Sequence, residues 1–347
     1  MSAPSPDALV AYGWSDRVAT LFHSDPAASS GRPGRVIRVE RGAVAVIDGS
    51  GTEQLCAPAG VPAVGDWVVV DGQRLAAVLP RWSSLDRRDP DTGRAQVLAA
   101  NVDLVLVTVP GDRPNSARAE RELVIAWESG ARGVVVLTKA DLATSGLVDK
   151  MTARLAGVEV IATSAETGAG IAELAALITR DRTGVLLGPS GAGKSRLTNA
   201  LLGEQRQATG EVRADDRRGR HTTTSRQLLP LPGGGVIIDT PGLRSLGLLS
   251  AERLDQVFPD IDALAADCRF ADCAHGIEPG CAVTAAVASG ELPSQRLASY
   301  NKLAREAAAE RRRTDPLERR DAKRAWKQRT MDARRNDKRH RPNQDRH

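Results

Sequence analysis

The sequence predicts a multidomain protein in which a small β-barrel, a doubly wound α/β domain and a mainly helical domain follow one another. Short β-type runs, with turn signals between them, fill residues 35–79. From residue 96, apolar runs alternate with helical stretches, and residues 250–313 have helical character around a cluster of cysteines and histidine. A chain of 347 residues is also too long for one ordinary core, which favours two or three domains.

The first part of the chain is expected to hold a helical arm and a barrel. Residues 7–24 have helix-like spacing, so we assign 1–30 to an N-terminal helical arm, with a breaker-rich linker at 26–34. We expect an OB-fold over 31–92, although an SH3-like barrel fits the pattern nearly as well. The expected strands are 35–40, 43–48, 52–56, 66–71 and 74–79.

The middle of the chain, residues 93–247, is expected to form the α/β domain. Its apolar runs are typical of parallel strands buried on both faces, and helical stretches separate most of them. The expected strands are 102–109, 133–138, 158–164, 184–187 and 235–239. After this domain we expect a helical metal-binding domain at 248–315 and a basic C-terminal tail at 316–347.

The charge of the chain is unevenly distributed. The net charge is +5, yet residues 301–347 hold 17 Lys and Arg against 8 Asp and Glu, so the body is mildly acidic. A basic tail predicts a polyanionic partner such as nucleic acid, and a tail that is merely solvated explains the charge equally well. Without a long apolar run or a signal-peptide pattern, we expect a cytoplasmic protein with no membrane partner.

A glycine-rich loop follows one expected strand and precedes an expected helix. Residues 188–195 read GPSGAGKS, which matches the P-loop pattern G-x-x-x-x-G-K-S. Glycines let backbone N–H groups turn toward a β-phosphate, and the helix N-terminus adds its positive end. Lys194 is expected to reach the β- and γ-phosphate oxygens, and the Ser195 hydroxyl to bind Mg²⁺. The expected nucleotide-binding residues here are Gly188, Pro189, Ser190, Gly191, Ala192, Gly193, Lys194, Ser195 and Arg196.

Two upstream loops indicate that the nucleotide carries guanine. The TKAD sequence, at the end of the run 133–138, offers Asp141 as an acceptor for guanine N1–H and the 2-amino group, with the Lys139 stem packed along the base. About 25 residues later a second strand ends in SAE, whose backbone would contact guanine O6. The expected base-binding residues are Thr138, Lys139, Ala140, Asp141, Ser164 and Ala165.

The motif DTPG completes the set in an unusual order. Asp239 can hold Mg²⁺ through water, and Gly242 can donate its N–H to the γ-phosphate. Between the P-loop and DTPG lies GRHTTT, a polar segment suited to a switch, in which Thr222 or Thr223 would complete the Mg²⁺ shell. TKAD and SAE precede the P-loop here, so we predict a circularly permuted GTPase, which a site built from loops on one sheet edge tolerates.

Hydrolysis needs a group that orients the attacking water. Many GTPases place glutamine just after this glycine, but Leu243 stands here and cannot do so, which predicts slow intrinsic turnover. His221, beside the switch threonines, can position water or accept a proton and is the candidate catalytic residue. An ordinary loop histidine is the equally weighted alternative.

The cysteine and histidine cluster has metal-ligand spacing. Cys268, Cys273, His275 and Cys281 fall within fourteen residues. A cytosolic protein seldom uses such residues for disulfides, and three thiolates with one imidazole make a closed tetrahedral Zn²⁺ site of structural type. The remaining cysteine, Cys56, is expected to be a small core residue of the barrel.

These motifs together resemble a known bacterial family, the ribosome small-subunit-dependent GTPase A proteins (RsgA, also called YjeQ or YloQ). The matching text is VGDWV at 64–68, QVLAANVD at 96–103, LTKADL at 137–142, GPSGAGKS at 188–195, GRHTTT at 219–224, DTPGLR at 239–244 and CRFADCAHGIEPGCAV at 268–283. The resemblance implies an OB-fold, a permuted GTPase domain and a zinc domain. It also implies that the protein binds the small (30S) ribosomal subunit and its 16S rRNA with GTP, assists late maturation and leaves after hydrolysis. By this resemblance the four cluster residues bind zinc and His221 holds the catalytic position.

Two other functions fit parts of the pattern. A P-loop kinase would share the phosphate loop, but TKAD and SAE argue against it. An RNA-remodelling protein that uses GTP only as a clamp would need the same barrel and basic tail. Since aromatic residues make up only 3% of the chain, RNA contacts should favour backbone and shape over base stacking. We expect a monomer.

Overall fold

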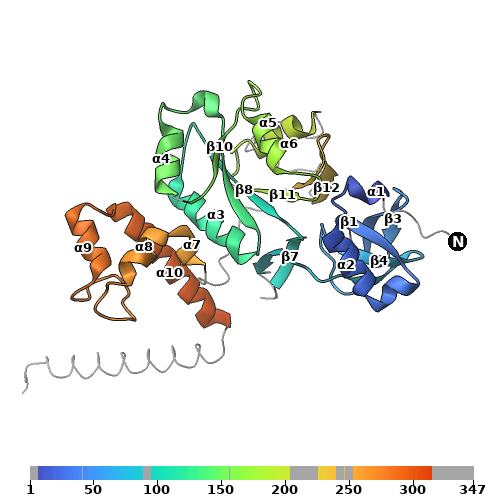
Figure 1. Cartoon of the computed structure of the whole chain (residues 1–347), viewed down its shortest axis with the longest axis horizontal. Helices are drawn as coiled ribbons and strands as arrows, with labels where there is room; N and C mark the ends of the chain where they lie inside the picture. Colours follow the sequence, from blue (N-terminus) through green and yellow to red (C-terminus); the bar gives the residue numbers. More distant parts are fainter. Residues whose placement is uncertain are drawn as a thin grey trace, which may run out of the picture. The chain divides into compact units, whose positions relative to one another are not determined.

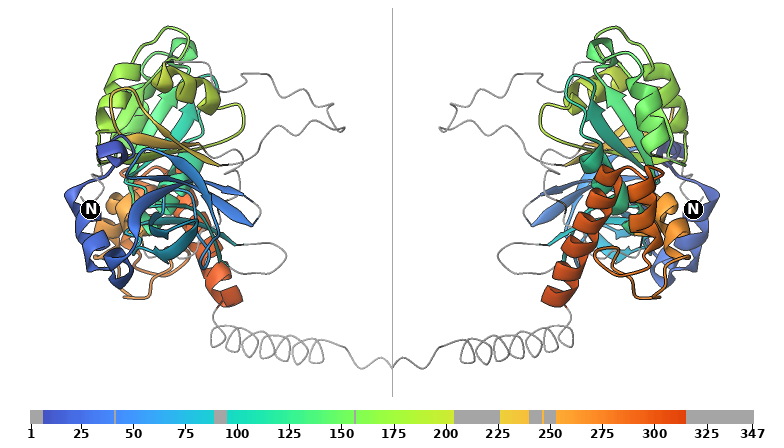
Figure 2. Two further views of the ribbon diagram at one scale, coloured as in Figure 1. Left: turned by 90° about the vertical axis from the view of Figure 1, so that its right-hand side faces the viewer. Right: turned by 90° about the vertical axis from the view of Figure 1, so that its left-hand side faces the viewer.

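The structure is a computed structural model that describes residues 7–40, 42–88, 95–155, 157–203, 226–239, 246 and 253–314. The chain divides into two compact units, Met1–Gly247 and Leu248–His347, which are described separately below. Figure 1 labels most of the elements, and Figure 2 shows the barrel strands (blue) and the α/β strands (green to yellow) of the first unit from two further sides.

The N-terminal segment forms two helices rather than the one expected over 7–24. Helix α1 covers Asp7–Val10 and α2 covers Asp16–Ser24, and Gly13 between them has φ 88°, which a helix cannot contain. The expected linker at 26–34 holds a 3₁₀ turn, η1 (Pro26–Ser29), and the start of the first strand. The Trp14 ring lies 5.5 Å from that of Trp67, so this arm packs on the barrel.

The barrel contains the five expected strands with ends shifted by a few residues. They are β1 (Arg32–Glu40), β2 (Ala43–Asp48), β3 (Glu53–Cys56), β4 (Trp67–Asp71) and β5 (Arg74–Val78). Strand β1 pairs with both β2 and β4, β5 pairs with β4, and the bridge between Ala57 and Arg74 closes the barrel. This is the closed five-stranded arrangement of an OB-fold. A Cβ at Gly34 would lie 2.6 Å from Val46 Cγ1, so a larger residue at this position would displace a buried valine of the barrel core.

A two-stranded ribbon, absent from our sequence-based expectations, connects the barrel to the α/β domain. Strands β6 (Ser84–Arg88) and β7 (Ala95–Ala100) pair antiparallel. A bridge between Val64 and Ala99 joins the ribbon to the barrel.

The α/β domain has the expected parallel strands in the order β10-β9-β8-β11-β13. Apolar residues of the strands, including Leu106 and Val136, pack on α5 and α6. On the opposite face, a Cβ at Gly133 would lie 2.7 Å from Leu123 of α3. The strands are β8 (Leu104–Pro110), β9 (Arg132–Thr138), β10 (Val160–Ala162), β11 (Thr183–Leu187) and β13 (Val236–Asp239). The helices are α3 (Ser116–Glu128), the 3₁₀ turn η2 (Ala140–Leu142), α4 (Leu147–Arg154), α5 (Ile171–Leu177) and α6 (Lys194–Leu202).

One strand that the sequence did not predict joins the two β-structures. Strand β12 (Gln227–Pro230) lies antiparallel to β13 and, on its other side, pairs with β1 at Arg38 and Gln227. The sheet of the α/β domain therefore continues into the barrel, and the joined sheet has eleven strands.

The second unit is helical, as expected. Its elements are α7 (Leu254–Val257), α8 (Pro259–Ala265), α9 (Ala282–Ser289) and α10 (Ser294–Thr314). The guanidinium of Arg296 in α10 donates two hydrogen bonds to Asp260, of 2.9 and 2.8 Å, and lies 4.4 Å above the buried Phe258 ring. These contacts fix α10 against α8.

Candidate nucleotide site and metal centre

The P-loop connects β11 to α6, and its glycines have backbone angles that residues with a side chain rarely adopt. Gly188, Gly191 and Gly193 have φ of 150°, 76° and 84°. A Cβ at Gly188 would lie 2.0 Å from Thr108 Oγ1, whose hydroxyl donates to the Leu187 carbonyl over 2.9 Å. Strand β8 thus lies too close for any residue but glycine at the start of the loop.

The ammonium of Lys194 lies over this loop. Its Nζ donates to the carbonyls of Gly188 and Pro189 over 2.8 and 2.7 Å. Gly193 is the N-cap of α6, so Lys194 and Ser195 stand at the helix N-terminus, where the dipole favours an anion. Ala192, within the loop itself, is fully buried.

The TKAD loop lies directly beside the P-loop. The buried Thr138 hydroxyl, at the end of β9, donates to the Ala192 carbonyl over 2.6 Å. Lys139 has φ 52°, and Asp141 is exposed in η2, which starts one residue after Lys139. The sheet therefore brings these two motifs together although 54 positions separate Thr138 from Ala192.

The SAE loop joins the same edge of the sheet. The Ala140 N–H donates to the Thr163 carbonyl over 3.0 Å, which ties TKAD to the residue before Ser164. Ser164 is buried, and its hydroxyl oxygen accepts from the Thr167 N–H over 3.2 Å. Glu166 and Arg196 of α6 approach to 3.7 Å, although both side chains are largely exposed and the pair contributes little stability.

Asp239 is at the end of β13, which runs parallel to β11 with Ile238 opposite Val185. It therefore lies at the same edge as the P-loop, as the sequence predicted. His221, Thr222, Thr223, Gly242 and Leu243 lie outside the described residues.

The four predicted metal ligands gather in the second unit. Their ligand atoms all lie within 4.8 Å of one another. Cys268 Sγ is 3.9 Å from Cys281 Sγ and 3.7 Å from His275 Nδ1, and Cys281 Sγ is 3.6 Å from that nitrogen. A tetrahedral ion with metal–sulfur bonds of about 2.3 Å places sulfurs about 3.8 Å apart and sulfur and nitrogen about 3.6 Å apart. The group fits such an ion.

Local structure prepares Cys281 for this role. It is the N-cap of α9, and the Thr284 N–H donates to its sulfur over 3.4 Å. Burial raises the pKa of the Cys281 thiol, but hydrogen bonds from Thr284 and His275 outweigh burial and lower the pKa to about 6. A thiolate, the form that binds metal, is therefore favoured at this position.

Comparisons with known proteins agree with this geometry. A family profile described as RsgA GTPase matches residues 78–249. The chain is 46% identical over 342 residues to the small ribosomal subunit biogenesis GTPase RsgA of Streptomyces coelicolor, covering 93% of each chain. It is 42% identical to the protein of the same name from Opitutus terrae, covering 92% of this chain and 95% of that one. The chain belongs to the RsgA GTPase family.

Solved structures support the same assignment. The chain is similar to YjeQ from Thermotoga maritima, with 29% identity, a TM-score of 0.61 and coverage of 80% of this chain and 98% of that one. It is also similar to YloQ, a circularly permuted GTPase, with 25% identity and a TM-score of 0.58 over 80% of this chain and 95% of that one. The predicted fold class is confirmed, and as a member of the RsgA family the chain is a GTPase.

Some residues around the nucleotide loops escaped the sequence analysis. Asp112, two residues beyond β8, pairs with Lys139 at 3.1 Å, and Thr108 supports the P-loop. A polar residue just beyond the end of a buried parallel strand was the available signal, because such ends face the site in this fold.

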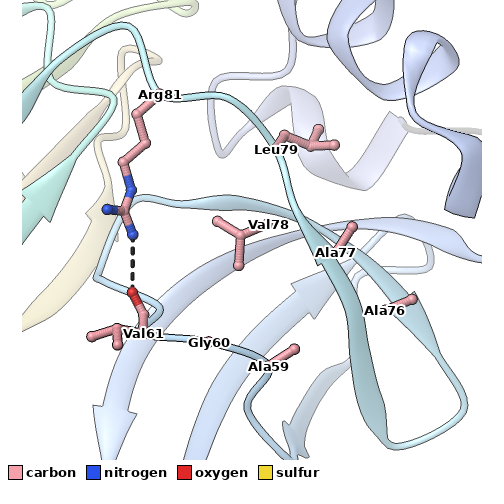
Figure 3. Close-up of a pocket in the computed structure, with 8 residues that line it drawn as sticks. All are labelled: Ala59, Gly60, Val61, Ala76, Ala77, Val78, Leu79 and Arg81. Carbon is pink, nitrogen blue, oxygen red and sulfur yellow. Dashed lines mark hydrogen bonds between the residues drawn. The ribbon is translucent and has the colours of Figure 1, made fainter.

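The barrel has an open pocket of its own. It lies between 59–61 and 76–79, and the Arg81 guanidinium points to the Val61 carbonyl at one end (Figure 3). The pocket contains none of the predicted nucleotide residues. Within the part of the chain that the structure describes, no helix combines the length and apolar character that a membrane span requires.

Proposed function

We propose that this chain is a GTPase that binds the small ribosomal subunit in its GTP form, assists late maturation of that subunit and leaves after hydrolysis. The hydrogen bond from Thr138 to Ala192 carries the nucleotide part of this proposal, because it joins the base-reading loop to the phosphate loop. The subunit part is supported by relatives that are named small ribosomal subunit biogenesis GTPases. The organisation into arm, barrel, GTPase domain, zinc domain and tail remains part of the proposal.

The nucleotide would lie across the C-terminal edge of the parallel strands. Residues 188–196 would bind the phosphates through backbone N–H groups and Lys194. Asp141 would accept from guanine, with Thr138, Lys139 and Ala140 beside it and Ser164 and Ala165 at O6. Successive strands are added on one side of β8 (β9, then β10) and on the other side from β11 onward, so the strand order reverses between β8 and β11. In an open α/β sheet, ligands bind at the carboxyl ends of the strands beside such a switch point.

Hydrolysis would depend on residues near the γ-phosphate. Ser195 and one of Thr222 and Thr223 would hold Mg²⁺, with Asp239 acting through water and Gly242 donating to the γ-phosphate. Bound Mg²⁺ would neutralise charge that develops on the phosphate oxygens. His221 would orient the attacking water, since Leu243 cannot, and contact with the subunit would be needed for fast turnover.

The metal of the second unit is proposed to be one structural Zn²⁺. Cys268, Cys273, His275 and Cys281 fill all four tetrahedral positions, so no position remains for a reacting water. The ion would hold the loop 268–281 in shape for binding the subunit.

RNA contact is proposed for the barrel and the zinc unit. The Trp67 side chain is only 1% exposed and packs on Trp14, so it does not offer a face for base stacking. Contacts to 16S rRNA should therefore be mainly to phosphate and sugar, with binding that falls steeply as salt rises. We further propose a cytoplasmic monomer.

The test is GTP turnover with and without purified small subunits. We expect stimulation by an order of magnitude or more, as for GTPases that need a partner to complete their site. Large subunits and ATP are the matched controls and should give no stimulated turnover. A chain that binds GTP and small subunits without accelerated hydrolysis would instead act as a GTP-dependent RNA clamp.

A further inference from the structure

The chain just after β8 packs tightly under the TKAD loop. The Gly111 N–H donates to the Thr138 carbonyl over 2.7 Å. A Cβ at Gly111 would lie 2.8 Å from the Lys139 carbonyl oxygen and 3.1 Å from that of Thr138, so no larger residue fits without movement. Asp112 is therefore held at a fixed place beside Lys139.

The Asp112 carboxylate contacts the lysine that the proposed site uses for the base. Lys139 Nζ donates to Asp112 Oδ2 over 3.1 Å, and the two side chains are 32% and 26% exposed. Partial burial raises the pKa of Asp112, but the hydrogen bond and charge of Lys139 outweigh it and lower the pKa below its ordinary value. Arg113 also approaches Asp112, at 3.9 Å, but it is 87% exposed, so solvent screens it strongly.

The backbone of Lys139 is itself unusual. Its φ of 52° lies in the left-handed region, which a non-glycine residue adopts at a cost, so the local structure fixes where the side chain leaves the loop. The long lysine side chain retains many rotamers even so, and ordering them on binding a base reduces affinity. An anchor for the ammonium limits those rotamers before the nucleotide arrives.

We propose that Asp112 is a positioning residue for guanine-nucleotide binding: it holds the Lys139 ammonium so that the aliphatic stem of that lysine lies along the plane of the base. This inference rests on the proposed binding of the base by TKAD. Asp112 acts through Lys139 and not on the phosphates, so it should affect GDP and GTP equally. The hydrogen bonds from the guanine edge to Asp141 should not depend on Asp112.

The test is a double-mutant cycle on the full-length protein. GDP and GTP affinities are measured by titration for the parent, Asp112→Ala, Lys139→Ala and the double variant. We expect Asp112→Ala to weaken both nucleotides by the same factor, about three- to ten-fold, and to have no further effect in the Lys139→Ala background. Asp112→Asn, which keeps an oxygen acceptor, should retain most of the affinity.

The control is Asp149→Ala, an exposed acidic residue on α4 of the same unit, which should leave both affinities unchanged. Equal losses from Asp112→Ala with and without Lys139, or no loss at all, would overturn the role of Asp112. If Lys139→Ala itself leaves the affinities unchanged, the proposed base site fails instead. Should Asp112→Ala not fold, Asp112→Ser, whose shorter side chain does not reach Lys139 Nζ, replaces it in the same cycle, and the same outcomes support or overturn the inference.

Discussion

The buried guanidinium of Arg35, in barrel strand β1, donates a 2.7 Å hydrogen bond to the hydroxyl of Thr183, the first residue of the strand that leads to the P-loop. The same side chain donates to the Tyr12 carbonyl and lies 4.7 Å above the Trp67 ring. Burial lowers the pKa of Arg35 to about 9, although Asp103 and Asp66 act in the opposite direction. One side chain thus connects the arm, the barrel and the GTPase sheet.

We predict that Arg35→Ala lowers the free energy of unfolding of the first unit by about 3 kcal/mol, because it removes the hydrogen bonds to Thr183 and Tyr12 and the packing on Trp67. Thr183→Val, which removes one hydrogen bond, should cost about 1 kcal/mol. Urea unfolding followed by tryptophan fluorescence measures both. Equal, small effects of the two substitutions would contradict a joining role for Arg35.

The Thr138 hydroxyl is predicted to be needed for tight nucleotide binding. Thr138→Val keeps the size of the side chain but removes the donor to Ala192, so the TKAD loop and the P-loop lose their direct connection. We expect GDP and GTP to bind about five- to ten-fold more weakly, the equivalent of about one hydrogen bond. Thr138→Ser, which keeps the hydroxyl, is the control and should bind nearly as the parent does. Unchanged affinity in Thr138→Val would show that the loops are held together by other contacts.

The nucleotide and metal motifs could be predicted because each is local in the sequence. The P-loop is marked by its glycines, which the sequence shows directly and which the backbone needs because their φ angles suit only glycine. The metal centre is marked by the spacing of its ligands from Cys268 to Cys281. Near-continuous apolar runs, separated by helical stretches, likewise located the five parallel strands, because a strand that is buried on both faces needs apolar residues on both sides.

Contacts between distant segments could not be predicted in this way. Strand β12 has only four residues and no distinctive periodicity, and it exists because β13 and β1 offer backbone partners on its two sides. The pairing of Asp112 with Lys139 spans 27 positions and depends on the register of β8 and β9. The helical spacing over 7–24 continues past Gly13, where the backbone in fact turns.

Glu122 is predicted to make stability depend on pH. It is buried in α3, and burial raises its pKa above 4.5, although the 2.7 Å ion pair with Arg118 partly offsets this. A carboxyl group with a raised pKa binds more protons in the folded than in the unfolded state. Its stabilising contribution is therefore complete below pH 4.5 and is lost as pH rises through the folded pKa.

Glu122→Gln removes this titration. The free energy of unfolding of the variant, relative to the parent, should therefore increase as pH rises from 4.5 through the folded pKa. Urea unfolding at a series of pH values measures the difference, and Glu173→Gln, on the exposed side of α5, is the control. A difference that stays constant or decreases over this range would contradict the prediction.

Removing the metal is predicted to disorder the loop 268–281 while leaving the first unit folded. Few apolar contacts hold this loop, since Phe270 is 41% exposed and Ile277 fully exposed, so its shape should depend on the four ligands. A strong chelator should therefore raise amide hydrogen exchange in 268–281, and added zinc should reverse it. Elemental analysis should find one metal per chain in the parent and in Cys56→Ala, whose cysteine is in the barrel core, but none in Cys273→Ala. Full metal content in Cys273→Ala would show that the ion is held elsewhere, and unchanged exchange after chelation would show that the loop folds without it.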